Sequence, residues 1–152
     1  MRHTPEKSSL SFIRITILAA ALALLLPAVA MAELPGIQIT ITGAEATEGT
    51  FEVSLFDSAE SFMKEPFLQM AGVPQEDGSV SAEFVGLVEG DYAVVVVHDA
   101  NGNGAFDSGF LGIGSEAYGF SNDVRPWFGW PEFEEVRIRV EDPETPVSIR
   151  LE

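Results

Sequence analysis

Residues 92–97 read Tyr-Ala-Val-Val-Val-Val, apolar at every position, and His98 and Asp99 follow directly. A short run of β-branched residues that is apolar on both faces predicts a central strand covered on both sides. Around it, shorter segments alternate apolar and polar residues, which is typical of strands with one buried face. These segments lie at 37–41, 51–55, 80–84, 136–140 and 147–151, with a weaker candidate at 67–73. About seven short strands separated by turn signals predict an all-β sandwich or small barrel.

The start of the chain has a different character. Three basic residues precede a twelve-residue apolar run at 15–26, and Ala-Met-Ala follows at 30–32. This order is typical of a signal peptide, here 1–32, cleaved after Ala32. An uncleaved membrane anchor is the alternative, for which the run is short. We therefore expect residues 33–152 to form one exported domain, periplasmic or secreted, without stable membrane insertion after cleavage.

The charge and the cysteine count restrict the function classes. Residues 33–152 carry five Lys or Arg and 23 Asp or Glu, a net charge of −18 with His98 neutral. Such a surface repels phosphate backbones, so nucleic acid is not an expected partner, whereas cations are attracted. The chain has no cysteine, which excludes disulfides and thiol catalysis. An exported domain without disulfides depends on its core or on a bound metal.

A long connection follows the central strand. Residues 99–132 show no strand pattern, but they are rich in glycine and aromatic residues. Structureless connections of this length are uncommon in compact domains, and disordered segments are poor in aromatic residues. We expect one long ordered loop that packs onto the sandwich.

The first part of this connection is a candidate calcium loop. Residues 99–107 read Asp-Ala-Asn-Gly-Asn-Gly-Ala-Phe-Asp, and calcium prefers six to eight oxygen ligands. Because a strand precedes the loop and residue 110 is Phe, it is not an EF-hand. The alternative is that the glycines form tight turns in which the aspartates accept bonds from backbone amides. The candidate ligands are Asp99, Asn101, Asn103, the carbonyl of Ala105, Asp107 and, from further along the connection, Glu116 or Asp123.

His98 is the only histidine in residues 33–152. It is the residue on which a hydrolase would depend, as a general base beside a neighbouring carboxylate or a bound metal. No nucleophile elbow surrounds the nearby serines, Ser115 and Ser121. A structural role, with the ring bonded to a loop carbonyl, is the competing interpretation.

The second part of the connection carries aromatic side chains that suit an interaction surface. Exposed Trp and Tyr rings stack on sugars or anchor protein partners, so a carbohydrate-binding module is a further alternative. The competing interpretation is a satellite core beneath the loop. The candidate surface residues are Tyr118, Phe120, Asn122, Arg125, Trp127 and Trp130.

Three segments resemble a known family: Glu89-Gly90-Asp91-Tyr92, the run from His98 to Gly104, and the run from Glu116 to Asn122. The chain resembles the uncharacterised bacterial secreted family catalogued as domain of unknown function 2141. The resemblance implies an exported protein with an immunoglobulin-like or transthyretin-like antiparallel β-sandwich. It implies no activity and no catalytic residues. The expectation is thus a non-enzymatic, exported sandwich in which calcium orders an aromatic surface for a protein or a glycan.

Overall fold

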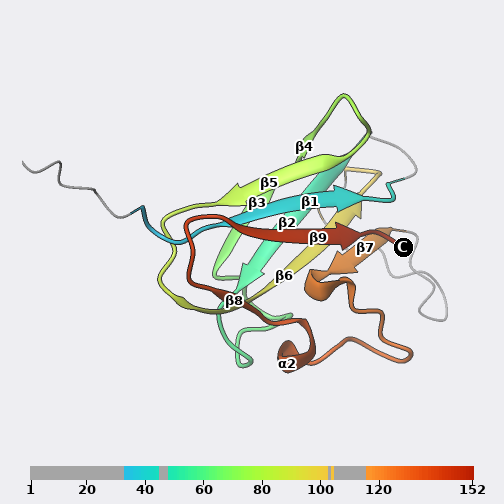
Figure 1. Cartoon of the computed structure of the whole chain (residues 1–152). Coiled ribbons are helices and arrows are strands. Elements are labelled where there is room, and N and C mark those ends of the chain that lie inside the picture. The colour runs from blue at the N-terminus through green and yellow to red at the C-terminus, as the bar shows by residue number, and fades with distance from the viewer. Residues whose placement is uncertain (1–32, 45–47, 103, 105–115) are drawn as a thin grey trace, which may run out of the picture. The chain divides into compact units, whose positions relative to one another are not determined.

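The computed structural model describes residues 33–44, 48–102, 104 and 116–152, and the predicted leader lies outside them. The described residues form two β-sheets of four and five strands, which confirms the all-β prediction (Figure 1). No helix in these described ranges is long and apolar enough to cross a membrane. In spatial order, the four-stranded sheet contains β4 (Val73–Pro74), β5 (Val80–Phe84), β1 (Ile37–Thr42) and β9 (Thr145–Arg150). The five-stranded sheet contains β3 (Leu68–Ala71), β2 (Thr50–Phe56), β6 (Gly90–Asp99) and β7 (Ala117–Phe120), and β8 (Ile138–Val140) also pairs with β6.

The predicted purely antiparallel pairing is wrong in one place. β1 and β9 run parallel, with Ile39 opposite Val147, whereas the other paired strands are antiparallel. Parallel neighbours need a long crossover between them. The first and the last strand of the domain satisfy this condition, because nearly the whole fold connects them.

The prediction also missed regular structure within residues 99–132 and beyond. The connection contains β7 and a short 3₁₀ helix, η2 (Ser121–Asp123), and a single-turn helix, α2 (Phe133–Val136), follows it. Val136, predicted to begin a strand, therefore ends a helix instead. A capping box explains this: the side chains of Glu132 and Glu135 each accept a bond from the backbone N–H of the other residue.

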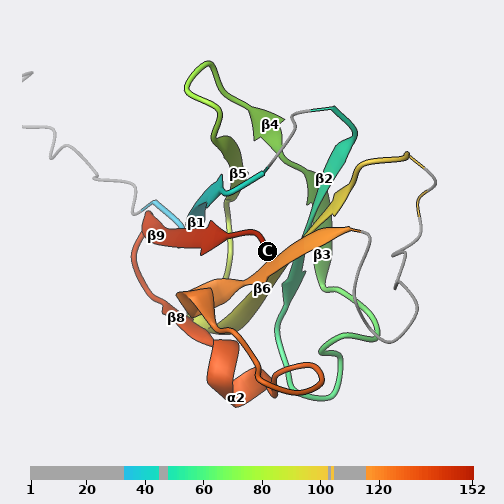
Figure 2. The ribbon, with the colours of Figure 1, turned by 90° about the vertical axis from the view of Figure 1, so that its right-hand side faces the viewer.

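The core lies between the two sheets, whose strands Figure 2 shows from another side. Tyr92, Val94 and Val96 of β6 point into it, because alternate residues of a strand face the same side. Fully burying one such side chain contributes about 1.5–3 kcal/mol. The other main contributors are Ile37, Ile39, Ile41, Phe51, Val53, Leu55, Val80, Phe84, Val147 and Ile149.

Both lateral edges of the sandwich are joined. On one side, β3 continues through Gly72 into β4, so one segment serves both sheets. On the other side, Tyr118 and Glu152 exchange two backbone hydrogen bonds of 3.2 and 3.0 Å. A Cβ at Gly119 would lie 2.5 Å from Cγ2 of Ile149, so β7 approaches β9 closely only because this residue is glycine.

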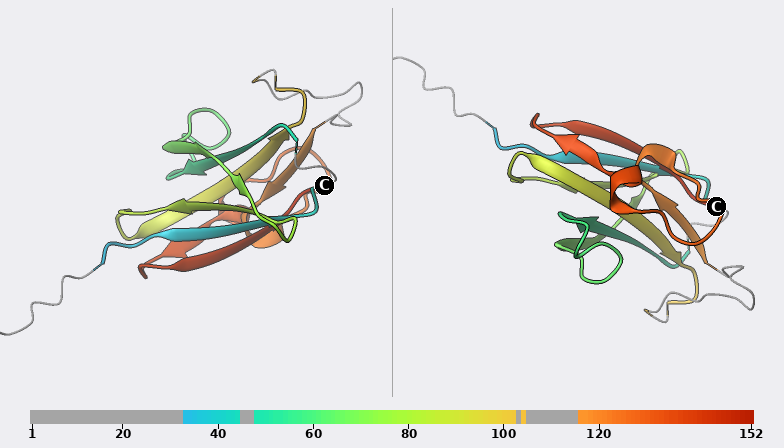
Figure 3. Two further views of the ribbon diagram at one scale, coloured as in Figure 1. Left: turned by 90° about the horizontal axis from the view of Figure 1, so that it is seen from above. Right: turned by 90° about the horizontal axis from the view of Figure 1, so that it is seen from below.

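A second apolar cluster covers part of the outer face of the five-stranded sheet, the face turned away from the other sheet. It joins Ala93 and Val95, the residues of β6 that alternate with the core residues, to side chains of α2 and β7. In the right-hand view of Figure 3, α2 lies in front of β6. We call this group the outer cluster: Phe56, Phe62, Ala93, Val95, Phe120, Phe133 and Val136.

Candidate functional site

Two buried carboxylates lie where β6 ends and β7 begins. His98 pairs with Ala117 across these antiparallel strands; Asp99 follows His98 as the last residue of β6, and Glu116 directly precedes β7. Only 5% of Asp99 and 4% of Glu116 is exposed. His98 and Ala117 face the inside of the sandwich. Successive residues of a strand point to opposite faces, so Asp99 and Glu116 lie on the outer face. The structure therefore places two of the predicted calcium ligands one position beyond the same paired residues of neighbouring strands.

The Asp99 carboxylate also organises the chain that follows it. Oδ1 accepts a hydrogen bond from the backbone N–H of Gly102 at 2.6 Å, and Oδ2 accepts one from Gly104 at 2.8 Å. Both glycines have positive φ, near 70°, which favours glycine. This is the turn geometry of the alternative interpretation.

The remaining predicted ligands do not complete a described site. Asn101 is exposed, and Asn103, Ala105 and Asp107 lie outside the described residues. Asp123 accepts a hydrogen bond from the backbone N–H of Arg150 at 3.1 Å and is the last residue of η2, after β7. Within the part of the chain that the structure describes, no three His, Asp or Glu side chains gather in an arrangement that could hold a metal ion.

His98 lies on the opposite face of β6 from Asp99. It is buried, its ring stacks on Phe51 with 4.1 Å between centroids and 2° between planes, and Nε2 lies 2.7 Å from the carbonyl oxygen of Glu48. This is the arrangement that the structural interpretation predicts for the ring. The geometry offers no dyad of His98 with Asp99 or Glu116, on which the hydrolase alternative depends.

The predicted aromatic surface divides into a buried part and an exposed part. Phe120 is buried in the outer cluster, so its inclusion among surface residues is wrong, and Tyr118 is half-buried beside it. Trp130 packs edge-on against Tyr118 at 71° and Phe120 at 70°, with centroids 5.3 and 5.9 Å apart. Rings crossed in this way do not form the flat platform on which a sugar stacks.

Residues 126–130, which end at Trp130, form an exposed aromatic tip. Trp127 is 101% exposed and Phe128 is 95% exposed, while Trp130 at the base is 47% exposed. Gly129 turns the chain with φ of 70°. On the preceding side, Arg125 forms ion pairs with Asp123 and Glu152. The tip therefore projects from a base that is held on both sides.

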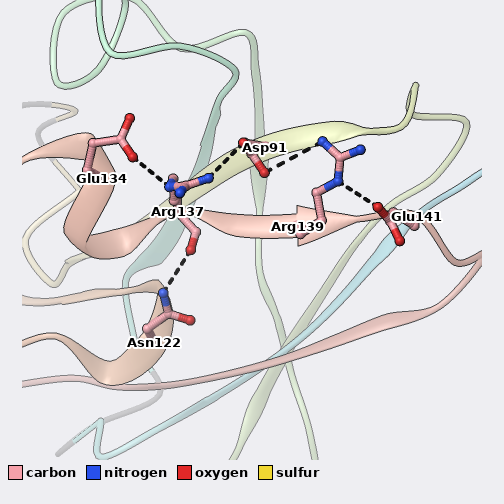
Figure 4. A network of polar contacts seen from close by, with 6 residues as sticks. All are labelled: Asp91, Asn122, Glu134, Arg137, Arg139 and Glu141. Carbon is pink, nitrogen blue, oxygen red and sulfur yellow. Dashed lines mark hydrogen bonds and ion pairs between the residues drawn. The ribbon is translucent and has the colours of Figure 1, made fainter.

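Asn122 has a structural role, and its predicted role in ligand binding stays a prediction. Its φ of 62° is a left-handed conformation that Asn tolerates, and its side-chain amide donates to the carbonyl oxygen of Arg137 at 2.9 Å. Arg137 binds Asp91 at 2.8 Å, and Arg139 approaches the same carboxylate at 3.8 Å. The hydrogen bond with Glu141, at 2.8 Å, is the main influence that raises the pKa of Arg139. Figure 4 shows this network of Asp91, Asn122, Glu134, Arg137, Arg139 and Glu141.

One buried polar residue was not predicted to have a structural role. β7 and β8 pair with different parts of β6 and leave Val94 between them. Ser121 fills the gap: its Oγ accepts the N–H of Val94 at 3.0 Å and donates to the carbonyl oxygen of Val136 at 2.5 Å. This role of Ser121 becomes visible only once β7 and β8 are both paired with β6, so the sequence alone carries no signal for it.

Comparison with known proteins identifies the family. Neither the curated proteins nor the solved structures contain a match to this chain. One family model matches residues 39–148, from β1 to β9, and thus covers both sheets and the candidate site. The chain therefore belongs to the family described as uncharacterized protein conserved in bacteria (DUF2141).

Proposed function

We propose that the protein is an exported, non-enzymatic β-sandwich module that binds one Ca²⁺ ion at the end of β6. Asp99 and Glu116 supply the carboxylates. Asn101, Asn103, the carbonyl of Ala105 and Asp107 complete the oxygen set. The ion orders the connection after β6, and the aromatic residues of that connection present a surface to a protein or a glycan.

The burial of two neighbouring carboxylates is the observation that supports this proposal most. Like charges withdrawn from water repel each other and lose hydration, and a divalent cation between them offsets both costs. Asp99 and Glu116 are each at least 95% buried at the next position beyond a paired residue. The net charge of −18 in residues 33–152 adds a long-range attraction for cations.

The loop geometry supports the same proposal. Backbone bonds from Gly102 and Gly104 hold both oxygens of the Asp99 carboxylate in a fixed orientation. A preorganised ligand loses less conformational entropy on binding. With few carboxylates, the affinity corresponds to that of extracellular modules, with Kd of about 0.1–1 mM.

The finer fold and the location are part of the same proposal. The two-layer arrangement of four and five short strands is compatible with an immunoglobulin-like or transthyretin-like sandwich. The apolar run at 15–26 and the Ala-Met-Ala at 30–32 support export by a cleaved signal peptide to the periplasm or the medium.

Thermal unfolding with calcium and with a chelator tests the metal. At a hundredfold excess over Kd, one bound ion adds about 2.7 kcal/mol, which raises Tm by roughly 10 °C for a domain of this size. Asp99→Asn and Glu116→Gln abolish the difference between the two conditions. Asp142→Asn, a matched change on an exposed residue in another loop, preserves it. Equal Tm values for the unchanged protein in both conditions would exclude the proposal.

A further inference from the structure

We propose that the aromatic tip, residues 126–130, is a docking knob that inserts Trp127 and Phe128 into an apolar pocket of a basic partner protein. This inference rests on the interaction surface of the proposed function and names its residues and the chemistry of its partner. It does not depend on the calcium ion.

The exposure of the two rings is the first observation. Single exposed apolar residues are ordinary, but Trp127 and Phe128 are adjacent, large and almost completely solvated. Phe120 and Phe133, which precede and follow the tip in the chain, are by contrast buried in the outer cluster. Trp is among the residues most enriched at the energetic centres of protein interfaces.

The rigidity of the base is the second observation. Trp130 packs against Tyr118 and Phe120, and Pro131 is buried behind it. The ion pairs of Arg125 hold the other side of the tip. A knob on a fixed base loses less conformational freedom on binding than one on a flexible loop.

The charge around the tip selects the partner. Within seven residues of Phe128 the chain has four acidic residues and one basic residue, Arg125, which is ion-paired with Asp123. The net charge of this stretch is therefore negative. Charge complementarity requires Lys and Arg around the partner's pocket. A second copy of this chain would meet its own negative charge. The acidic residues concerned are Asp123, Glu132, Glu134 and Glu135.

A membrane is the less favourable occupant. Stable anchoring to a bilayer takes two signals, an apolar group together with a second apolar group or a basic patch. Anionic lipids, which attract basic segments, repel a domain with a charge of −18. A pocket in a basic protein can bury both rings, and its Lys and Arg side chains can pair with the acidic residues around the tip.

Site-specific photocrosslinking tests the inference in the bacterium that produces the protein. The full chain carries p-benzoylphenylalanine in place of Phe128, and a control chain carries it in place of Val88, which is 77% exposed in the turn before β6. We expect a protein adduct from position 128 and none from position 88. The crosslinked peptide is expected to come from an apolar pocket bordered by Lys or Arg.

Binding of the purified partner completes the test. Trp127→Ala and Phe128→Ala each weaken the affinity by about 30-fold or more, the size of an interface hot spot, and added salt slows association. The inference is overturned by no adduct at position 128, by an adduct with lipid, with an acidic protein or with a second copy, or by an affinity that Trp127→Ala leaves unchanged. Thermal unfolding with calcium, run on the same protein, separates failure of the knob from failure of the metal site.

Discussion

The two faces of the five-stranded sheet have different compositions. The inner face is apolar from Tyr92 to Val96, and at its end His98 stacks on Phe51. The outer face changes character along β6: it is apolar around Val95, beneath α2, and acidic at Asp99. The inner face stabilises the sandwich by burial, whereas for the acidic end of the outer face we propose cation binding. The inner face thus maintains the fold, and the acidic end of the outer face is the part of the sheet for which we propose binding.

The sharpest test of this comparison uses three phenylalanines. Phe51 on the inner face and Phe120 on the outer face are both buried, while Phe128 is exposed. We expect Phe51→Ala and Phe120→Ala each to lower the free energy of unfolding by about 3–5 kcal/mol, because each leaves a cavity. Phe128→Ala is expected to change it by less than about 0.5 kcal/mol. Equilibrium denaturation in urea measures all three variants.

A small cost for Phe120→Ala, below about 1 kcal/mol, would show that the outer cluster is not a second core. In that case the distinction between a packed and a binding half of the outer face would fail. Equal m values among the variants would show that the differences in the free energy of unfolding arise in the native state.

Much of the inner face was predictable from the sequence. The alternation at 37–41, 51–55, 80–84 and 147–151 agrees with β1, β2, β5 and β9, and the apolar run at 92–97 lies within β6. β1, β2, β5 and β9 alternate buried and more exposed residues, because only one face of each strand is buried. β6 is apolar throughout 92–97, because both of its faces are covered there. Such a pattern depends only on which side of the strand meets the core.

The outer face was less predictable, because distant contacts determine it. β7 has only four residues, one of them Gly119, whose absent side chain allows the approach to Ile149. Val136 continues an alternating pattern, yet a local capping box makes it helical. The sequence predicts Asp99 and Glu116 as ligands, but only the pairing of His98 with Ala117 places each one position beyond a paired residue.

The join between the two halves of the outer face gives the next prediction. Ser121→Ala removes the acceptor for the buried N–H of Val94 and the donor to Val136. Leaving a buried polar group unsatisfied costs about 1–3 kcal/mol, and we expect a loss of this size in the free energy of unfolding. Ser148→Ala, an exposed serine on β9, is the matched control and is expected to cost less than about 0.5 kcal/mol. Equal effects of the two changes would contradict the role of Ser121.

The smallest effect is expected at the exposed edge of the sheet. Asp91→Ala removes the carboxylate shared by Arg137 and Arg139, but these groups are partly exposed to water. Exposed ion pairs contribute little, so the expected loss is below about 1 kcal/mol and decreases with added salt. Denaturation at low and at high salt measures it. A loss above about 2 kcal/mol that is insensitive to salt would assign this network a role in the core.

Calorimetric titration of calcium into the full-length protein tests the central claim most directly. We predict one site with a Kd of about 0.1–1 mM, absent in Asp99→Asn and retained in Asp142→Asn. The absence of any saturable heat at millimolar calcium in the unchanged protein would contradict the account. Asp99 would then keep the turn-forming role that the bonds from Gly102 and Gly104 indicate.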